Sequence, residues 1–166
     1  MRGLYRVTPC IGPITIECVY RIHPHRRAVR MGHLKTYIVE DSPVIRENLI
    51  AALEELVSVD VVGTAADEST AVQWLSSQTN DCDLMIVDVF LAQGSGLGVL
   101  KAAREHEKPT KLVVLSNYAT TDMRRKCLEL GADQVFDKSN EIDALMAYCM
   151  RLSNGDSGNS GFSALS

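Results

Sequence analysis

The sequence has 166 residues, of which 46% are hydrophobic and 23% charged, close to the average soluble globular protein. This length fits one domain with a few dozen residues to spare and excludes two large domains. No uncharged apolar run approaches the ~20 residues of a membrane-spanning helix, and Glu17 interrupts the apolar stretch near the N-terminus. Neither a membrane span nor a secretory signal is expected, so a cytoplasmic protein is the default.

Positive charge is concentrated at the start of the chain. Residues 1–33 hold six Arg and one acid, a net charge of +5, whereas residues 34–166 carry −9. The acidic part argues against a broad nucleic-acid surface on the folded domain. Residues 1–33 lack a helical or strand period and contain three prolines, which predicts a basic, poorly ordered extension. It is a solvated tail, an arm for nucleic acid or an acidic partner, or sequence added by a wrong start before Met31.

From residue 34 onward, short apolar runs alternate with helical segments, the pattern of a parallel sheet built from β/α units. The runs are nearly continuous Val, Ile and Leu, as strands covered on both faces should be. The expected strands are 34–39, 59–63, 84–87, 111–115 and 134–136. After them, residues 153–166 are mostly Ser, Gly, Asn and Asp, which predicts a disordered tail.

Five helices fit between and after these strands. Ser42 and Asp67 are expected caps of the first two, with Pro43 at the opening position of the first. The others cover 97–106, 121–130 and 140–152, and Gly131 is a left-handed cap of the fourth. The side chains expected to face inward are Ile45, Leu49, Leu53, Leu56, Val72, Leu75, Leu97, Leu100, Ala103, Ile142, Leu145, Met146 and Cys149.

The cysteines are scattered, odd in number and free of any C-x-x-C pair. This spacing predicts neither a zinc site nor a full disulfide framework, so they are interpreted as packing residues or unreactive thiols. They are Cys10, Cys18, Cys82, Cys127 and Cys149.

Polar residues stand where the predicted strands end, and ligands of open parallel sheets bind beyond these ends. Glu40 and Asp41 follow the first strand, Asp88 the third, Ser116 the fourth and Lys138 the fifth. Two carboxylates 4 Å apart repel by roughly 4 kcal/mol at an effective dielectric of 20, so the cluster needs positive charge. Mg²⁺, which prefers oxygen ligands, and the Lys138 ammonium supply it. Asp88 is then a candidate nucleophile toward a phosphoryl group, with Ser116 as a hydroxyl donor.

Four motifs carry a family resemblance: Tyr37-Ile-Val-Glu-Asp-Ser42, Met85-Ile-Val-Asp88, Val113-Val-Leu-Ser116 and Gly131-Ala-Asp-Gln-Val-Phe-Asp-Lys138. In order and spacing they resemble the receiver domain of two-component response regulators over residues 34–152. The resemblance implies an α/β, flavodoxin-like (βα)5 three-layer sandwich with a five-stranded parallel sheet in order 2-1-3-4-5.

The resemblance also implies a site chemistry. A sensor histidine kinase or a phosphotransfer protein would phosphorylate Asp88. Mg²⁺ would be held by Asp41, Asp88 and the Phe90 carbonyl, with Glu40 assisting through water. Lys138 and Ser116 would bind the phosphoryl oxygens.

The function implied is phosphorelay signalling rather than an enzyme activity, because a receiver catalyses only its own phosphorylation and dephosphorylation. No effector domain fits after residue 152, so a stand-alone regulator acting on a downstream protein target is expected. The family's usual output face is the fourth helix, fifth strand and fifth helix, and a homodimer through it is a hypothesis. On this chain the face would include Arg124, Arg125, Lys126, Met146 and Met150.

Several positions depart from the family pattern. Ser139 replaces the Pro that commonly follows the Lys, which puts a cis peptide there in doubt. Val135 stands at the aromatic switch position, and Phe136 points to the other face of the sheet. Ala92 replaces a common Pro. We therefore expect coupling to the fourth helix to be weaker or differently connected.

Phe90 and Tyr118 lie two residues beyond Asp88 and Ser116, at positions that flank the path of the hydrolytic water in similar receivers. Two aromatic rings there are expected to cover this path and prolong the life of the aspartyl phosphate. The alternative is that both rings pack on the loop surface and leave the path open.

Two other functions are alternatives. A Mg²⁺-dependent phosphatase of the haloacid dehalogenase class uses a D-x-D motif after its strand. Here Asp88 is followed by Val89 and Phe90, whereas Asp81 and Asp83 precede the strand. The second alternative is a receiver-like docking module that accepts no phosphate.

Overall fold

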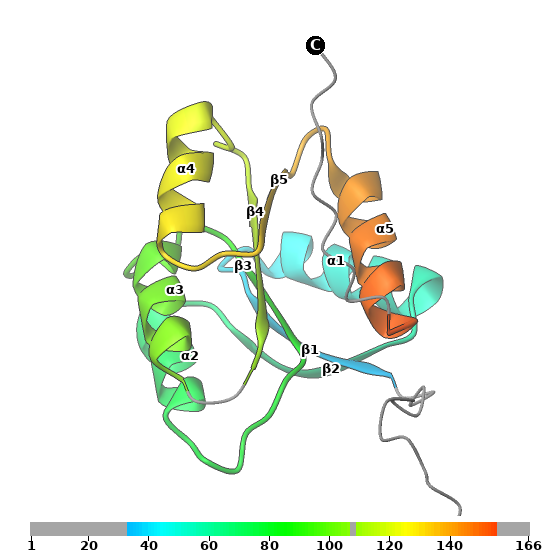
Figure 1. The fold of residues 1–166 in the computed structure, drawn as a ribbon, viewed down its shortest axis with the longest axis horizontal. Helices are drawn as coiled ribbons and strands as arrows, with labels where there is room; N and C mark the ends of the chain where they lie inside the picture. The colour runs from blue at the N-terminus through cyan, green and yellow to red at the C-terminus, as the bar shows by residue number, and fades with distance from the viewer. Residues whose placement is uncertain (1–32, 107–108, 156–166) are drawn as a thin grey trace, which may run out of the picture.

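The computed structural model describes residues 33–106 and 109–155, in which five strands alternate with five helices (Figure 1). The strands are β1 (Leu34–Val39), β2 (Val59–Ala65), β3 (Leu84–Val87), β4 (Lys111–Ser116) and β5 (Gln134–Asp137). The helices are α1 (Pro43–Leu56), α2 (Glu68–Leu75), α3 (Gly96–Glu105), α4 (Thr121–Glu129) and α5 (Ile142–Ser153). Residues 1–32 of the predicted extension, with Cys10 and Cys18, and 156–166 of the predicted tail lie outside the described residues.

The five strands form one parallel sheet in the order β2-β1-β3-β4-β5, which confirms the predicted flavodoxin-like (βα)5 fold. Neighbouring strands end almost level with one another. Val39 pairs with Val87, Val87 with Val114, and Ser116 with Asp137. The residues that follow these strands therefore meet at one edge of the sheet.

Helices cover both faces of this sheet, which makes three layers (Figure 1). The α2, α3 and α4 helices pack on one face, and α1 and α5 pack on the other. Side chains alternate between the faces, so Tyr37 and Val39 of β1 join the first group and Ile38 the second. Both faces are dry, which explains why β3 is buried at all its positions and reads as a continuous apolar run.

The helix ends agree with the local sequence signals. The Ser42 hydroxyl accepts the N–H of Ile45 at the start of α1, and the Asp67 carboxylate accepts the N–H of Thr70 at the start of α2. Gly131 follows α4 with a φ of 103°, in the left-handed region where glycine meets no steric penalty.

The expected inward stripe of α1 is partly wrong. Leu49 and Leu53 are buried, but Ile45 and Leu56 are 37% and 55% exposed. Val57, four residues after Leu53, takes the buried place that was expected for Leu56. Of the other inward positions, those buried are Leu75, Leu100, Ala103, Leu145, Met146 and Cys149, and those partly buried are Val72, Leu97 and Ile142.

Cys127 in α4 and Cys149 in α5 are fully buried, as expected for packing residues. Burial raises the pKa of both thiols, that of Cys149 to about 12, so both are held in the unreactive protonated form. No helix of the described residues is long and apolar enough to cross a membrane.

Candidate functional site

The sheet topology brings the predicted site residues to one cavity at the carboxyl edge. Glu40 and Asp41 follow β1, Asp88 follows β3, Ser116 ends β4 and Lys138 follows β5. All five line a cavity of about 200 Å³. Phe90 and Tyr118 line it as well, together with Ser42, Ile45 and Asn117.

Lys138 is the central contact of this cavity. Its ammonium donates hydrogen bonds of 2.6 Å to Glu40 Oε2 and of 2.6 Å to Asp88 Oδ2. The three side chains are at most 9% exposed. Burial on its own would lower the pKa of Lys138, but the hydrogen bonds and negative charges of Asp88 and Glu40 outweigh it and raise that pKa. The site therefore holds Lys138 firmly as a cation.

Backbone groups hold the second oxygen of each carboxylate. Glu40 Oε1 accepts the N–H of Ser42 at 3.1 Å, and Asp88 Oδ1 accepts the N–H of Phe90 at 3.2 Å. Every oxygen of these two buried acids thus has a donor, as burial demands. Arg46, which the sequence did not single out, donates to the carbonyl of Glu40 at 2.8 Å and fixes the turn between β1 and α1.

The acidic residues Glu40, Asp41 and Asp88 offer oxygen atoms that all lie within 4.8 Å of one another. Lys138 balances one of these three charges, so the cluster keeps a net negative charge near −2 when all three are ionised. Hard oxygen ligands with uncompensated charge fit Mg²⁺, which binds through one or two carboxylates and keeps several waters. The donor set therefore suits the ion that the sequence implies.

Asp41 is held by the loop that follows Asp88. Its Oδ2 accepts the N–H of Ala92 at 3.0 Å. A proline at position 92, common among similar receivers, has no N–H and could not make this contact. The departure from the pattern thus has a structural consequence, because it ties the β3–α3 loop to the acidic cluster.

Ser116 is fully buried at the end of β4 and faces the cavity. Its hydroxyl accepts the N–H of Tyr118 at 3.4 Å, and its carbonyl accepts the N–H of Lys138 at 3.1 Å. The hydroxyl hydrogen is free to turn toward an oxygen in the cavity, because the contact with Tyr118 uses only a lone pair.

Phe90 and Tyr118 form an edge-to-face pair at the mouth of the cavity, with ring centroids 4.9 Å apart. They are 51% and 62% exposed. The rings therefore contact each other across the two loops that follow β3 and β4, instead of each packing separately on its own loop.

Val135 is buried on the α4 side of the sheet and Phe136 on the α5 side, so Phe136 does not reach the switch position. The carbonyl of Val135 accepts a 2.6 Å hydrogen bond from Arg124, which also binds the carbonyl of Ala119 and the carboxylate of Glu141. The hydrogen bond from Arg124, followed by one from the backbone of Asp137, lowers the pKa of Glu141. Arg124 thus joins the β4–α4 loop, β5 and the start of α5.

The peptide bond before Ser139 is trans, as are all others in the described residues. Its N–H donates to Asp137 Oδ1 at 2.7 Å, a contact that proline could not make. This contact keeps the Asp137 carboxylate in the turn after β5.

The D-x-D alternative does not fit this geometry. Asp81 and Asp83 lie at the opposite end of β3, where they contact the side chain and the backbone N–H of Lys35. Position 90, where that class of phosphatase needs its second acid, is Phe90.

An open parallel sheet of this order, with a lysine-bridged acidic cavity at its carboxyl edge, defines a receiver-type α/β domain. The family model for the response regulator receiver domain matches residues 36–149. The chain therefore belongs to this family, whose members act in two-component systems and whose general properties include Mg²⁺ and a phosphorylated Asp.

Known relatives place the same domain in longer proteins. The chain is 33% identical over 115 residues to the transcriptional regulatory protein DltR of Streptococcus agalactiae, covering 69% of this chain and 49% of DltR. It is 30% identical over 107 residues to a protein-glutamate methylesterase/protein-glutamine glutaminase of Leptospira interrogans. This match covers 63% of this chain and 30% of the methylesterase. The chain thus spans about half or less of the length of these relatives.

A solved structure of RcsB from Salmonella enterica, bound to promoter rprA with the phosphomimetic BeF3⁻, shares the fold with a TM-score of 0.61 at 19% identity. The match covers 71% of this chain and 68% of that one. At this identity the likeness supports the fold alone.

Proposed function

We propose that this chain is a phosphoacceptor that receives a phosphoryl group on Asp88 from the phosphohistidine of a sensor kinase or phosphotransfer protein. The observation that carries the proposal is the contact of Lys138 with both Glu40 and Asp88, beside the buried hydroxyl of Ser116. Such a cavity holds an acid nucleophile and two groups able to bind phosphoryl oxygens.

Each residue has a distinct part in this step. A carboxylate oxygen of Asp88 forms a bond to phosphorus while the phosphorus–nitrogen bond of the donor breaks, and the electron pair leaves with the histidine. The Lys138 ammonium, now between Asp88 and Glu40, binds a phosphoryl oxygen, and the Ser116 hydroxyl donates to another. Asp41, Asp88 and the Phe90 carbonyl would hold Mg²⁺, with Glu40 assisting through water. The ion supplies the charge that offsets the approach of an anionic donor to an acidic cavity.

Intact-mass measurement tests this function. The protein is incubated with Mg²⁺ and a small phosphodonor such as acetyl phosphate, and the gain of one phosphoryl group is expected. Asp88→Asn should abolish the gain. The matched control is Asp137→Asn, because Asp137 also ends a strand, but its carboxylate accepts hydrogen bonds from Ser139 and Asn140 in the turn after β5 and lies outside the residues that line the cavity. No gain in the wild type would support a docking module that accepts no phosphate.

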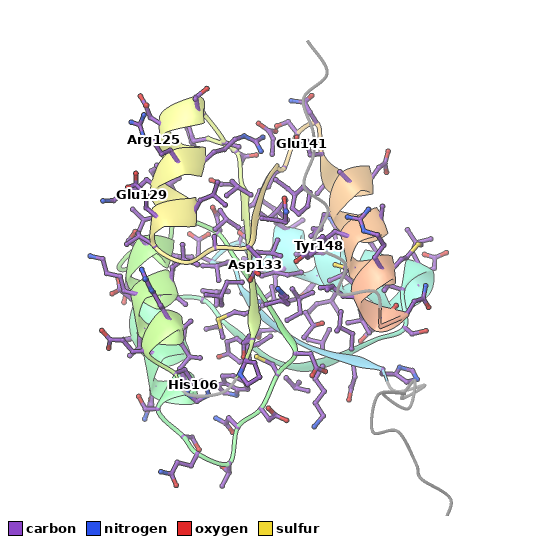
Figure 2. The ribbon with its side chains drawn as sticks, viewed as in Figure 1. His106, Arg125, Glu129, Asp133, Glu141 and Tyr148 are labelled. Carbon is purple, nitrogen blue, oxygen red and sulfur yellow. The ribbon has the colours of Figure 1, made fainter. Side chains whose placement is uncertain are left out.

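The output surface is proposed to be α4, β5 and α5. Arg125 and Glu129 point outward from α4, as Figure 2 shows. Leu128 and Met150 are exposed apolar residues of these helices. Met146, expected here from the sequence, is only 5% exposed against 40% for Met150, because it lies on the inward face of α5. It belongs to the core and is removed from the surface.

We propose that a downstream protein target, or a second copy of this chain, binds this surface after phosphorylation. Light scattering with and without beryllofluoride measures self-association, and a monomer in both states at high concentration would contradict the dimer. Nucleic acid is expected to avoid the acidic receiver itself, although RcsB was solved with DNA. A gel-shift assay with random duplex tests that expectation.

The regulator is proposed to act on its own, to remain in the cytoplasm and to turn over no external substrate. The mass of the protein in its native cells checks the first point. A species well above 18.2 kDa would show an attached output domain and contradict it.

A further inference from the structure

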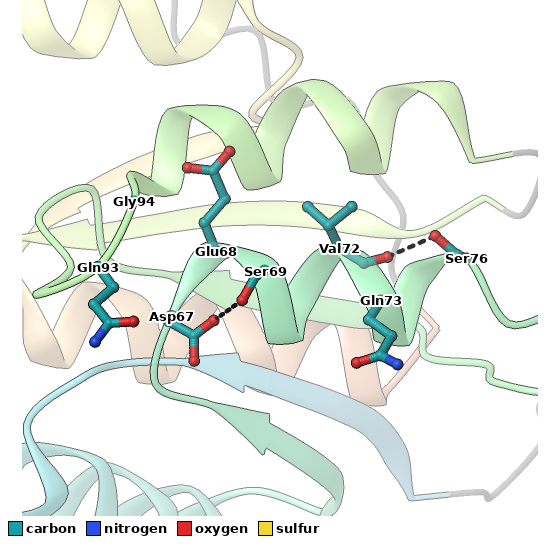
Figure 3. A pocket seen from close by; sticks show the side chains of 8 residues that line it. All are labelled: Asp67, Glu68, Ser69, Val72, Gln73, Ser76, Gln93 and Gly94. Carbon is teal, nitrogen blue, oxygen red and sulfur yellow. Dashed lines mark hydrogen bonds between the residues drawn. The ribbon is translucent and has the colours of Figure 1, made fainter.

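Glu68, the first residue of α2, joins that helix to the loop that leaves the phosphoacceptor site. Its Oε2 accepts the N–H of Ser95 at 2.7 Å, and its own N–H donates to the carbonyl of Gln93 at 3.3 Å. Ser95 is the N-cap of α3. Figure 3 shows the Glu68 side chain rising from α2 toward α3, beside Gly94. One side chain thus anchors the far end of the loop.

Because Gly94 and Gly98 have no side chains, there is room for the side chain of Glu68 between α2 and α3. The three atoms nearest to a Cβ built on Gly98 all belong to the Glu68 carboxylate, and the closest, Oε1, is 1.9 Å away. Gly94 has a φ of +79°, and a Cβ there would lie 2.4 Å from the Glu68 Cβ. The loop and the first turn of α3 are therefore fitted around this carboxylate. Its negative charge also suits the positive N-terminal end of α3.

The anchor reaches the site through short contacts within the loop. Ser95 Oγ donates to the carbonyl of Val89 at 3.4 Å, and the N–H of Gly96 donates to the same carbonyl at 2.9 Å. Val89 stands between Asp88 and Phe90. Holding Ser95 therefore fixes the peptide that precedes Phe90, while the N–H of Ala92 binds Asp41 midway along the loop.

We propose that Glu68 is a positioning residue for the phosphoacceptor site. This inference rests on the phosphoacceptor function proposed above. By holding Ser95, Glu68 keeps the β3–α3 loop in the conformation that presents the Phe90 carbonyl to Mg²⁺, and it does so without touching the ion. Groups that orient metal ligands in this way typically change metal affinity by 10–100-fold when they are removed.

The test is a double-mutant cycle with Mg²⁺ affinity as the readout, measured by NMR titration of the amide signals around Asp88. Glu68→Ala and Gly98→Ala should each weaken Mg²⁺ binding on the order of tenfold. The second substitution acts because its methyl group pushes the carboxylate away from Ser95. The double variant should match either single variant, since both remove one contact. Glu68→Gln, which keeps an oxygen acceptor, should recover most of the affinity.

Asp67→Ala is the matched control for a purely structural effect. Asp67 caps the same helix, but its side-chain bonds go to Ser69 and Thr70 of α2. This variant should lose stability and keep the Mg²⁺ affinity of the wild type. Circular dichroism checks that each variant is folded.

Three results would overturn the inference or its basis. Wild-type affinity in both Glu68→Ala and Gly98→Ala would contradict the positioning role. Losses that multiply in the double variant would show that the two positions act separately, which also contradicts it. A wild-type protein that binds no Mg²⁺ would instead refute the proposed phosphoacceptor function on which the inference rests.

Discussion

Replacing Lys138 by Met tests the charge balance of the cavity most directly. Met keeps much of the apolar stem but removes the ammonium that bridges Glu40 and Asp88. Two carboxylates, whose side chains are at most 9% exposed, then lie in one cavity with no cation between them. We expect a folded variant of lower stability that accepts no phosphoryl group.

The size of the effect follows from the geometry. At 2.6 Å and an effective dielectric of 20, each contact of Lys138 is worth about 6 kcal/mol of Coulomb attraction. Desolvation of the three charges cancels most of this, and breaking a buried pair by removing one partner costs about 3–5 kcal/mol. The lower end, about 3 kcal/mol of unfolding free energy, is expected because the cavity opens to water on one side.

Urea unfolding at pH 7 without Mg²⁺ measures this loss. The signal is the fluorescence of Trp74, the single tryptophan of the chain, which stacks on the buried ring of Tyr37 at 4.0 Å. The matched control is Lys111→Met, because Lys111 makes a 2.7 Å ion pair with Asp133 and its side chain is 46% exposed. It should lose no more than about 1 kcal/mol.

A second variant separates charge from packing. Adding Asp88→Asn to Lys138→Met removes one of the two unbalanced carboxylates and should recover about half of the lost stability. The reasoning is refuted if Lys138→Met lies within about 0.5 kcal/mol of the wild type, the range of ordinary surface substitutions. It is also refuted if the double variant is less stable than Lys138→Met alone.

Three further outcomes are expected. Asp41→Ala should abolish the amide shifts that millimolar Mg²⁺ induces near the site, whereas Asp137→Ala should leave them unchanged. Replacing Phe90 by Asn together with Tyr118 by Glu should speed decay of the phosphorylated protein about tenfold, or ~1.4 kcal/mol of barrier, and an equal or slower decay would contradict shielding by the rings. Because the folded pKa of Lys138 is raised, its stabilisation is complete below its ordinary value of 10.5 and disappears as the pH rises through the folded value. The difference in unfolding free energy between the wild type and Lys138→Met should therefore be constant below pH 10.5 and shrink as the pH rises through the folded pKa of Lys138.

The sheet and the acidic cavity could be predicted from the sequence because they depend on short-range signals. The bounds of β1 and β3 were predicted to the residue, because both strands are rich in Tyr, Ile, Val, Leu and Met, and β3, buried at every position, is a continuous apolar run. The polar residues after those runs had to meet, because parallel strands end at one edge. The prediction of Glu40, Asp88 and Lys138 in one place thus needed only the order of the strands.

Residues that act across helices were not predicted. Neither Glu68 nor Gly98 was singled out from the sequence. The two residues depend on each other, because the absence of a side chain at Gly98 makes room for the carboxylate of Glu68. Arg124 was assigned only to a surface, although it binds three elements at once. Such contacts depend on how α2, α3 and α4 pack, which local sequence patterns do not specify.

The unusual residues of this receiver share one physical theme. Where similar receivers have proline, Ala92 and Ser139 each supply a backbone N–H: that of Ala92 binds Asp41 of the acidic cluster, and that of Ser139 binds Asp137 in the turn after β5. Glu68 adds a third anchor at the far end of the same loop as Ala92. A loop held by hydrogen bonds at several points loses less conformational freedom when an ion binds, so less of the binding energy is spent on ordering it. At Ala92 and Ser139 the chain thus has a hydrogen bond to one of its own carboxylates, where a proline would fix φ and offer no donor.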